Sequence, residues 1–203
     1  MIPYKEMKKL LLIFVCFPMV GLGQNVNIPD ANFKSYLVGN TGVNGVNTNG
    51  DNEIQVSEAT AFTGTLWCHG LDISDLTGIE AFTSVNKLYC EMNQLTSLDV
   101  SANSALTTLV CYDNQLTSLD VSQNTSLIVL WCWENQLTSL DVSQNIELTL
   151  LTCYSNQLTS LDISQNNNLT ELQCWDNQIT SLDVSQNSAL GYVLCQNNQL
   201  TSL

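Results

Sequence analysis

Seven cysteines have the most regular spacing of any residue type in the chain, so they are the first candidates for chemistry. Besides Cys16, they recur with one interval of 22 residues and then five of 21: Cys68, Cys90, Cys111, Cys132, Cys153, Cys174 and Cys195. Thiols can bind zinc or form disulfides, but no C-x-x-C pair is present and an odd number cannot pair completely. We therefore favour a column of free, buried thiols acting as small apolar fillers, with occasional disulfides or a metal as alternatives.

The titratable groups near these cysteines offer little for catalysis. His69 is the single histidine of the chain, and no recognisable nucleophile motif surrounds it. Glu91, Asp113 and Glu134 could supply the two carboxylates that glycoside cleavage requires. A flat, repetitive sheet nevertheless lacks the enclosed pocket that shifts the pKa of a carboxylic acid. We therefore expect that the protein is not an enzyme.

Aromatic residues accompany the cysteines, and acids follow them closely. All four tryptophans stand directly before or after a cysteine. Large rings give much contact area at small entropic cost, so the pattern predicts a recognition surface for a basic patch on a protein or for a glycan lying across the rings. The candidate binding residues are Tyr89, Tyr112, Asp113, Trp131, Trp133, Glu134, Tyr154, Trp175 and Asp176. The alternative is that the rings only stack on neighbouring strands, which would make the chain a structural spacer or surface-array repeat without a dedicated ligand.

A 21-residue repeat must position these side chains. Around each cysteine the sequence reads L-x-x-L-x-C-x-x-N-x-L, as in "LTTLVCYDNQL" at 106–116. Leu109 and Cys111 alternate with Val110, which indicates a short strand with one inward set of side chains. A single coil cannot bury its leucines, but a neighbour stacked about 4.8 Å away can, so the repeat predicts a β-rich solenoid. Asparagines at the turns should hydrogen-bond the backbone of adjacent coils as two ladders, one through Asn114 and its equivalents and one through Asn124 and its equivalents.

The repeat resembles the leucine-rich repeat, with cysteine in the place of the third leucine. Its nested half-units of ten and eleven residues are similar to the bacterial 21-residue class of that family. From about residue 28 to 203, the chain looks like the secreted leucine-rich repeat proteins of flavobacteria and their relatives. The resemblance implies a leucine-rich repeat stack of about seven coils over 63–203, with the strand sheet as its concave, ligand-facing side.

The segment 24–62 is expected to form a short helical N-terminal cap. In "IPDANFKSYLV", Phe33 and Leu37 fall on one helical face and an acid lies near the start. The stretch "NTNGDNEIQVSE" at 47–58 resembles the calcium loop of EF-hands. Asn52 stands where glycine normally makes the turn, and we expect it to adopt the left-handed conformation there. One weak, structural Ca²⁺ is predicted, or else a loop that keeps this shape without metal; the ligands would be Asn47, Asn49, Asp51, the carbonyl of Glu53, and Glu58.

Both ends of the sequence carry expectations about the whole protein. Residues 1–23 combine a basic start with an apolar run and small residues, which predicts a signal peptide cleaved before Gln24 and a secreted or cell-surface location. Its removal leaves Lys34 and Lys87 against 18 acids, a formal charge of −16. Such a surface repels phosphate backbones and anionic lipids, so we expect neither nucleic-acid binding nor membrane insertion. The last residue, Leu203, falls in the middle of the seventh coil, and we expect a piece of a longer protein.

A column of aspartates recurs on the second half of each coil. Each is followed two positions later by serine; the aspartates are Asp99, Asp120, Asp141, Asp162 and Asp183. Carboxylates aligned in this way repel one another unless they are hydrogen-bonded or bridged by cations. We expect turn-type hydrogen bonds to the local backbone, with calcium along the column or ordered water over the Thr/Ser array as alternatives.

Overall fold

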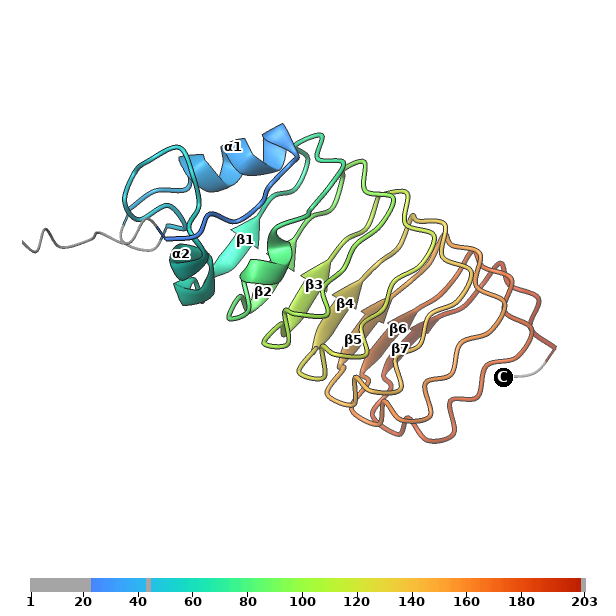
Figure 1. The fold of residues 1–203 in the computed structure, drawn as a ribbon. Coiled ribbons are helices and arrows are strands. Elements are labelled where there is room, and N and C mark those ends of the chain that lie inside the picture. The colour runs from blue at the N-terminus through green and yellow to red at the C-terminus, as the bar shows by residue number, and fades with distance from the viewer. Residues whose placement is uncertain (1–22, 43–44, 202–203) are drawn as a thin grey trace, which may run out of the picture.

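Seven three-residue strands form a single parallel sheet in chain order, in a computed structural model that describes residues 23–42 and 45–201 (Figure 1). The strands are β1 Thr65–Trp67, β2 Lys87–Tyr89, β3 Thr108–Val110, β4 Val129–Trp131, β5 Leu150–Thr152, β6 Glu171–Gln173 and β7 Tyr192–Leu194. Equivalent repeat positions are the register partners, as Leu109 is to Leu130. The prediction of a β-rich leucine-rich repeat solenoid with about seven coils is therefore confirmed.

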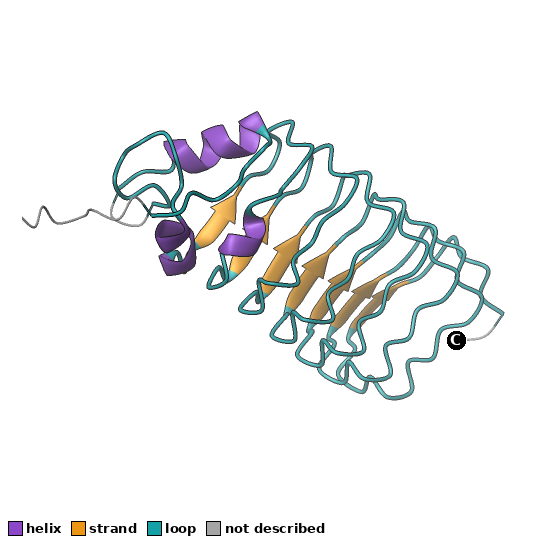
Figure 2. Cartoon of the chain, viewed as in Figure 1, coloured by secondary structure: helices purple, strands orange, loops and turns teal. Residues whose placement is uncertain are grey.

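The core is a set of inward columns that each coil extends by one residue. Leu109, Cys111, Leu116 and Val121 of one coil are all 0% exposed. Between the strands the chain is almost entirely loop and turn, so the coils stay thin (Figure 2). Since no coil encloses a core by itself, burial depends on both neighbours.

Both asparagine ladders are present and supply the hydrogen bonds that the turns need. Nδ2 of Asn114 donates to the carbonyls of Cys90 and Cys111, each at 3.1 Å, and its Oδ1 accepts from the backbone N–H of Leu95 at 3.0 Å. At the other corner, Nδ2 of Asn124 donates to the carbonyls of Val100 and Asn103 at 2.9 and 3.0 Å. Each ladder thus ties a coil to its predecessor, which explains why the same residue recurs at these positions.

The N-terminal cap packs over the first coil. Helix α1 spans Ala31–Gly39 and buries Phe33 and Leu37, as expected, and it starts after Asp30, whose Oδ1 caps two backbone N–H groups at 2.9 Å. The other carboxylate oxygen of Asp30 accepts from Ser74 N at 2.9 Å, which joins α1 to the first coil.

Two shorter helices complete the N-terminal end of the stack. They are α2, Val56–Ala61, and the 3-10 helix η1, Ile79–Ala81, and both lie at the same end of the solenoid as α1 (Figures 1 and 2). Within the described residues, no helix has the length and apolar character needed to cross a bilayer. The predicted signal peptide, 1–23, lies outside the described residues except for Gly23.

Candidate functional site

The strand face consists of the outward side chains of β1–β7 together with the residue that follows each cysteine. Because the strands are parallel and in register, equivalent positions form straight columns across the sheet. Trp131, for example, is the register partner of Val110 on one side and of Thr152 on the other. All nine predicted binding residues lie in these columns or one position beyond them.

The column after the cysteines contains a continuous stack of four aromatic rings. Tyr112 and Trp133 have ring centroids 3.8 Å apart, the next pair is at 4.8 Å and Tyr154–Trp175 is at 4.2 Å, all within 15° of parallel. Ring faces inside this stack contact one another, so only ring edges and the two end faces are available to a ligand. A sugar that packs flat on an aromatic face has no open face within the stack.

A second, shorter stack lies at the N-terminal end of the strand face. Trp67 and Tyr89 are parallel at 3.9 Å, and Trp67 is 52% exposed. The phenolic oxygen of Tyr36, on α1, accepts a hydrogen bond from Trp67 N at 2.7 Å, so the cap holds this end of the face in place. Trp67 therefore belongs to the same surface as the nine predicted residues. Its position directly before a cysteine is the sequence feature that indicates this placement.

Trp131 lies on the face but joins no ring stack. It is half-buried, and its Nε1 atom has no hydrogen-bond partner. The neighbouring Thr152 is 5% exposed, and its hydroxyl is also without a partner. The middle of the strand face therefore holds two polar groups that the chain itself leaves unsatisfied, which is costly in a folded protein.

The acids at the edge of the face share one backbone conformation. Asp113, Glu134 and Asp176 have φ of 51°, 48° and 51°, in the left-handed region, and the first two are exposed. Every coil repeats this turn, and none of the residues found there is β-branched, which is the sequence signal for it. Asp176 also accepts a hydrogen bond from Asn197 of the next coil at 2.7 Å.

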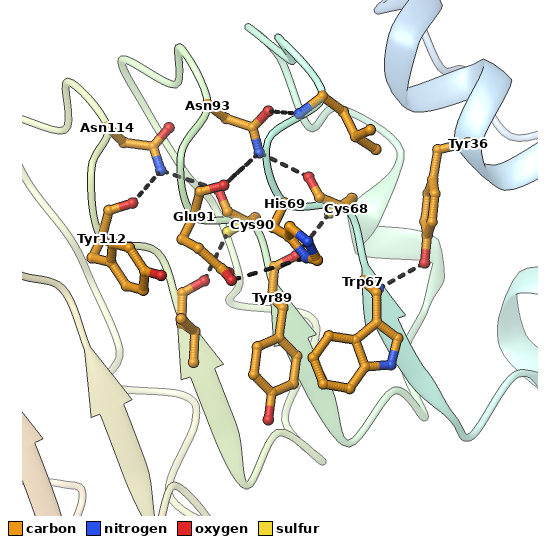
Figure 3. A network of polar contacts seen from close by, with 12 residues as sticks. Tyr36, Trp67, Cys68, His69, Tyr89, Cys90, Glu91, Asn93, Tyr112 and Asn114 are labelled. Carbon is orange, nitrogen blue, oxygen red and sulfur yellow. Dashed lines mark hydrogen bonds and ion pairs between the residues drawn. The ribbon is translucent and has the colours of Figure 1, made fainter.

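Glu91 differs from the other carboxylates of the face. It is only 8% exposed, its Oε1 lies 4.0 Å from Nδ1 of His69, and its Oε2 has no partner (Figure 3). Burial raises the pKa of the Glu91 carboxyl above its ordinary value. The expectation that a flat sheet shifts no carboxyl pKa is therefore wrong at Glu91, because the neighbouring side chains cover this carboxyl group and exclude water. Asp113 and Glu134 are exposed, so Glu91 is the only buried member of the three acids considered for glycoside cleavage.

The seven cysteines from Cys68 onward are free, and six of them are fully buried in one inward column; Cys195 is half-buried. Burial raises the pKa of the Cys68 and Cys111 thiols to about 12, so both stay protonated at neutral pH and are poor nucleophiles. In the part of the chain that the structure describes, no three His, Cys, Asp or Glu side chains gather in a metal-binding arrangement. The cysteine column is thus the apolar filler that the sequence predicts.

The aspartates of the second half-coil make the predicted turn-type bonds. Oδ1 of Asp141 accepts from Ser143 N at 2.9 Å, and the equivalent bond recurs in every coil from Asp99 to Asp183. This bond holds the pKa of Asp141 below its ordinary value. We call these five aspartates and the serines two positions after them the Asp–Ser column.

The EF-hand-like loop closes through hydrogen bonds among its own groups. Oε1 of Glu58 accepts from Thr48 N at 2.8 Å and from Asn49 N at 3.2 Å, so Glu58 folds back over the start of the loop. Asn49 Nδ2 donates to Asp51 Oδ2 at 3.0 Å, and Asn47 Nδ2 to the Asp51 carbonyl at 2.7 Å.

Two features of this loop bear on a cation. The expected left-handed turn at Asn52 is wrong: Gly50, with φ of 74°, makes it two positions earlier, since glycine adopts this conformation at no steric cost. The side chain of Glu53 pairs with Lys34 at 2.8 Å. Carboxylate and amide oxygens that suit calcium are therefore gathered here, while two amide nitrogens also lie among them and the turn departs from the EF-hand pattern.

The fold and the cysteine column define the class as a leucine-rich repeat protein. No family model matches the sequence. Over 77 residues the chain is 42% identical to internalin J of Listeria monocytogenes, a stretch that covers 37% of this chain and 8% of internalin J. The solved functional domain of that protein, described as including a cysteine ladder, is 33% identical and covers 89% of this chain and 49% of the domain, with a TM-score of 0.54. The chain is thus a leucine-rich repeat protein related to the Listeria internalins, and it spans less than a tenth of internalin J.

Two further solved structures have the same architecture. A leucine-rich repeat protein of Leptospira interrogans is 30% identical over 63% of this chain and 35% of its own, with a TM-score of 0.59. Internalin C2 of Listeria monocytogenes covers 88% of this chain and 90% of its own with a TM-score of 0.62, but at 19% identity it supports the fold alone.

Proposed function

We propose that the protein is a secreted or cell-surface recognition module that binds a basic protein through its strand face. The observation that supports this most directly is the composition of that face. Two aromatic stacks occupy it and its residues change from coil to coil, whereas the Asp–Ser column repeats the same two residues from Asp99 to Ser185. Aromatic side chains with polar groups at their edges are typical of protein-binding surfaces.

A protein partner is favoured over a glycan because of how the rings are arranged. Sugars pack on open aromatic faces, but the faces inside the stack from Tyr112 to Trp175 are covered by one another. Ring edges and the exposed acids Asp113 and Glu134 are what the surface presents. Edges and carboxylates suit a partner with lysine and arginine side chains, and the excess of acids would speed its association.

The test is a binding panel that separates the strand face from net charge. The purified chain is immobilised and exposed to basic proteins, acidic proteins and a glycan array. We expect salt-sensitive binding of a subset of the basic proteins, and at least tenfold weaker binding after Trp131→Thr, Trp133→Thr and Trp175→Thr are combined.

The matched control removes charge from the other side of the coils. Asp120→Asn, Asp141→Asn and Asp162→Asn together neutralise three acids of the Asp–Ser column and should leave selective binding intact. If the aromatic variant keeps all binding while its circular dichroism is unchanged, the structural spacer becomes the better description. Glycan binding that the aromatic variant loses would instead establish a sugar-binding face.

We also propose one weak structural Ca²⁺ in the 47–58 loop. The support is that Glu58 lies over Thr48 and Asn49, as the last acid of such a loop must, and that Asp51 is on the same turn. Calorimetry on the purified chain should show heat at millimolar Ca²⁺, and that heat should disappear with Asp51→Ala. Glu58→Gln keeps a hydrogen-bond acceptor in the turn and should weaken the metal while keeping the fold. The absence of heat in the unaltered chain would exclude the metal.

A further inference from the structure

A gap interrupts the ring column of the strand face. From Tyr112 to Trp175 each coil places an aromatic ring directly after its cysteine, but the preceding coil places Glu91 there and the first coil His69. Trp133 covers one face of the Tyr112 ring at 3.8 Å. On the other side the column continues with a carboxylate in place of a ring. The face of an aromatic ring carries partial negative charge, so it repels a carboxylate placed beside it.

The carboxylate in this gap is buried without full compensation. The Glu91 side chain is 11% exposed, Oε2 has no hydrogen-bond partner, and the nearest candidate for its charge is His69 Nδ1 at 4.0 Å from Oε1. Figure 3 shows the Glu91 side chain extending from the segment after β2 toward His69, with the rings of Tyr112 and Tyr89 nearby. The higher pKa of Glu91 agrees with this geometry, because burial is its first cause. A charged group in such a position is stabilised by a cation that enters the gap.

In the part of the chain that the structure describes, no lysine or arginine side chain pairs with Glu91. Arginine is absent from the sequence, and among the described residues Lys34 is paired with Glu53 at 2.8 Å. Lys87 is exposed on β2 and, within the same described part of the chain, forms no ion pair with any acid. Within the described residues, His69 is thus the only cationic side chain that lies near Glu91.

We propose that Glu91, bordered by His69 and by the side of the Tyr112 ring away from Trp133, is the subsite that receives one arginine side chain of the basic partner. A guanidinium group is planar, so it can stack on Tyr112 and extend the ring column while donating to the Glu91 carboxylate. It brings hydrogen-bond donors for the carboxylate and a planar face for the ring in one group, which an ammonium group of lysine does less well. This subsite rests on the proposed function for its biological role, but its chemistry can be tested without the partner.

The probe is arginine amide, followed by NMR at the imidazole of the single histidine, His69. We expect saturable shifts of the His69 imidazole resonances at millimolar arginine amide, weaker shifts with lysine amide and none with the neutral isostere citrulline amide. Glu91→Gln should weaken the arginine amide about tenfold or more. Asp120→Asn, in the Asp–Ser column, removes one acid far from the gap and should leave the titration unchanged.

A second variant tests whether the Tyr112 ring contributes to binding. It also keeps the proposal testable if Glu91→Gln does not fold. Tyr112→Leu should reduce the preference for arginine amide over lysine amide, because the flat face is lost while Glu91 is kept. Equal shifts with citrulline amide, an unchanged titration in Glu91→Gln, or no saturation in the unaltered chain would each overturn the subsite. Should Glu91→Gln fail to fold by circular dichroism, the comparison of arginine with citrulline and the Tyr112→Leu result decide the matter.

The two proposals fail in different ways. If the chain binds a basic protein through its tryptophans but shows no arginine-amide saturation, this inference is wrong and the recognition function stands. If arginine amide saturates at His69 but the aromatic variant retains every partner, the subsite exists and the strand face is not the main binding surface.

Discussion

The strand face and the Asp–Ser column are built from the same 21-residue coils, yet their polar side chains differ in whether they have hydrogen-bond partners within the chain. In the Asp–Ser column, each carboxylate accepts a hydrogen bond from the backbone of its own turn. On the strand face, Glu91 Oε2, Trp131 Nε1 and Thr152 Oγ1 have no partner. One region repeats a locally satisfied motif, and the other varies from coil to coil.

This difference supports the proposal that the strand face is the specific surface. A side chain that is satisfied by its own turn gains little from a partner, whereas an unsatisfied buried group gains the full value of a new hydrogen bond. The identity of the outward residues also changes along the strand face, so a partner can be aligned with one register of the coils only. The following predictions, from the largest effect to the smallest, test whether the two regions differ as described.

Asn135→Ala should be the most destabilising of these changes, because Asn135 joins its coil to the backbone of the preceding coil. Its Nδ2 donates to the carbonyls of Cys111 and Cys132 at 3.1 and 3.2 Å, and its Oδ1 accepts from Leu116 N at 2.9 Å. Leaving these buried groups unpaired should lower the free energy of unfolding by about 3 kcal/mol. Urea denaturation measures the loss, with the exposed neighbour Gln136→Ala as the control; equal values for the two would contradict the ladder's role.

Trp133→Ala should cost about 2 kcal/mol of unfolding free energy, since it removes the ring that contacts Tyr112 at 3.8 Å and Tyr154 at 4.8 Å. The value is below that of a core tryptophan because the side chain is only half-buried. Thr138→Ala, exposed on the other half of the same coil, should stay within about 0.5 kcal/mol. A cost for Trp133→Ala as small as that of the control would mean that the rings serve a ligand and not the sheet.

Glu91→Gln should stabilise the protein at neutral pH by about 1 kcal/mol, because it replaces an incompletely compensated buried carboxylate. The raised pKa of Glu91 means that the folded state holds its proton more tightly than the unfolded state. In the unaltered chain this group's contribution is therefore most favourable below the ordinary pKa of 4.5 and is lost as pH rises through the folded-state value. Urea titrations over this range should show that decline in the unaltered chain and its absence in Glu91→Gln; parallel curves would refute the assignment.

Asp141→Ala should have the smallest effect, about 0.5 kcal/mol at neutral pH, because its hydrogen bond to Ser143 N at 2.9 Å is open to solvent. The lowered pKa of Asp141 gives the opposite sign to Glu91. Its contribution is present above the unfolded-state pKa and is lost as pH falls through the folded-state value. Asp141→Asn keeps the acceptor and should resemble the unaltered chain at neutral pH, and an Asp141→Ala penalty that persists at low pH would exclude the turn bond as its source.

Periodic features were predictable because they repeat a local rule. The inward position of Cys111, the ladder bond of Asn114 and the turn bond of Asp141 each follow from spacing, side-chain chemistry and the need to satisfy the backbone. The aromatic column was predictable for the same reason, as strands in register place equivalent residues side by side.

Features that depend on the size of neighbouring side chains were not predictable. The burial of Glu91 results from the larger residues around it, and a flat-sheet argument misses it. The rotation of the Trp131 ring, which leaves its Nε1 atom without a partner, also depends on the side chains around it. In the 47–58 loop, the left-handed turn at Gly50 instead of Asn52 depends on the hydrogen bonds of Asn47 and Glu58, which no motif comparison includes.

The sequence by itself determined the solenoid, its register and the two surfaces, because a fixed period of inward leucines and cysteines can be buried only by stacking coils. Only the tertiary structure decided which groups on the strand face are covered and which lack a partner. Burial and pairing depend on side chains from three adjacent coils at once, and those contacts are set by distance in space and not by spacing along the chain.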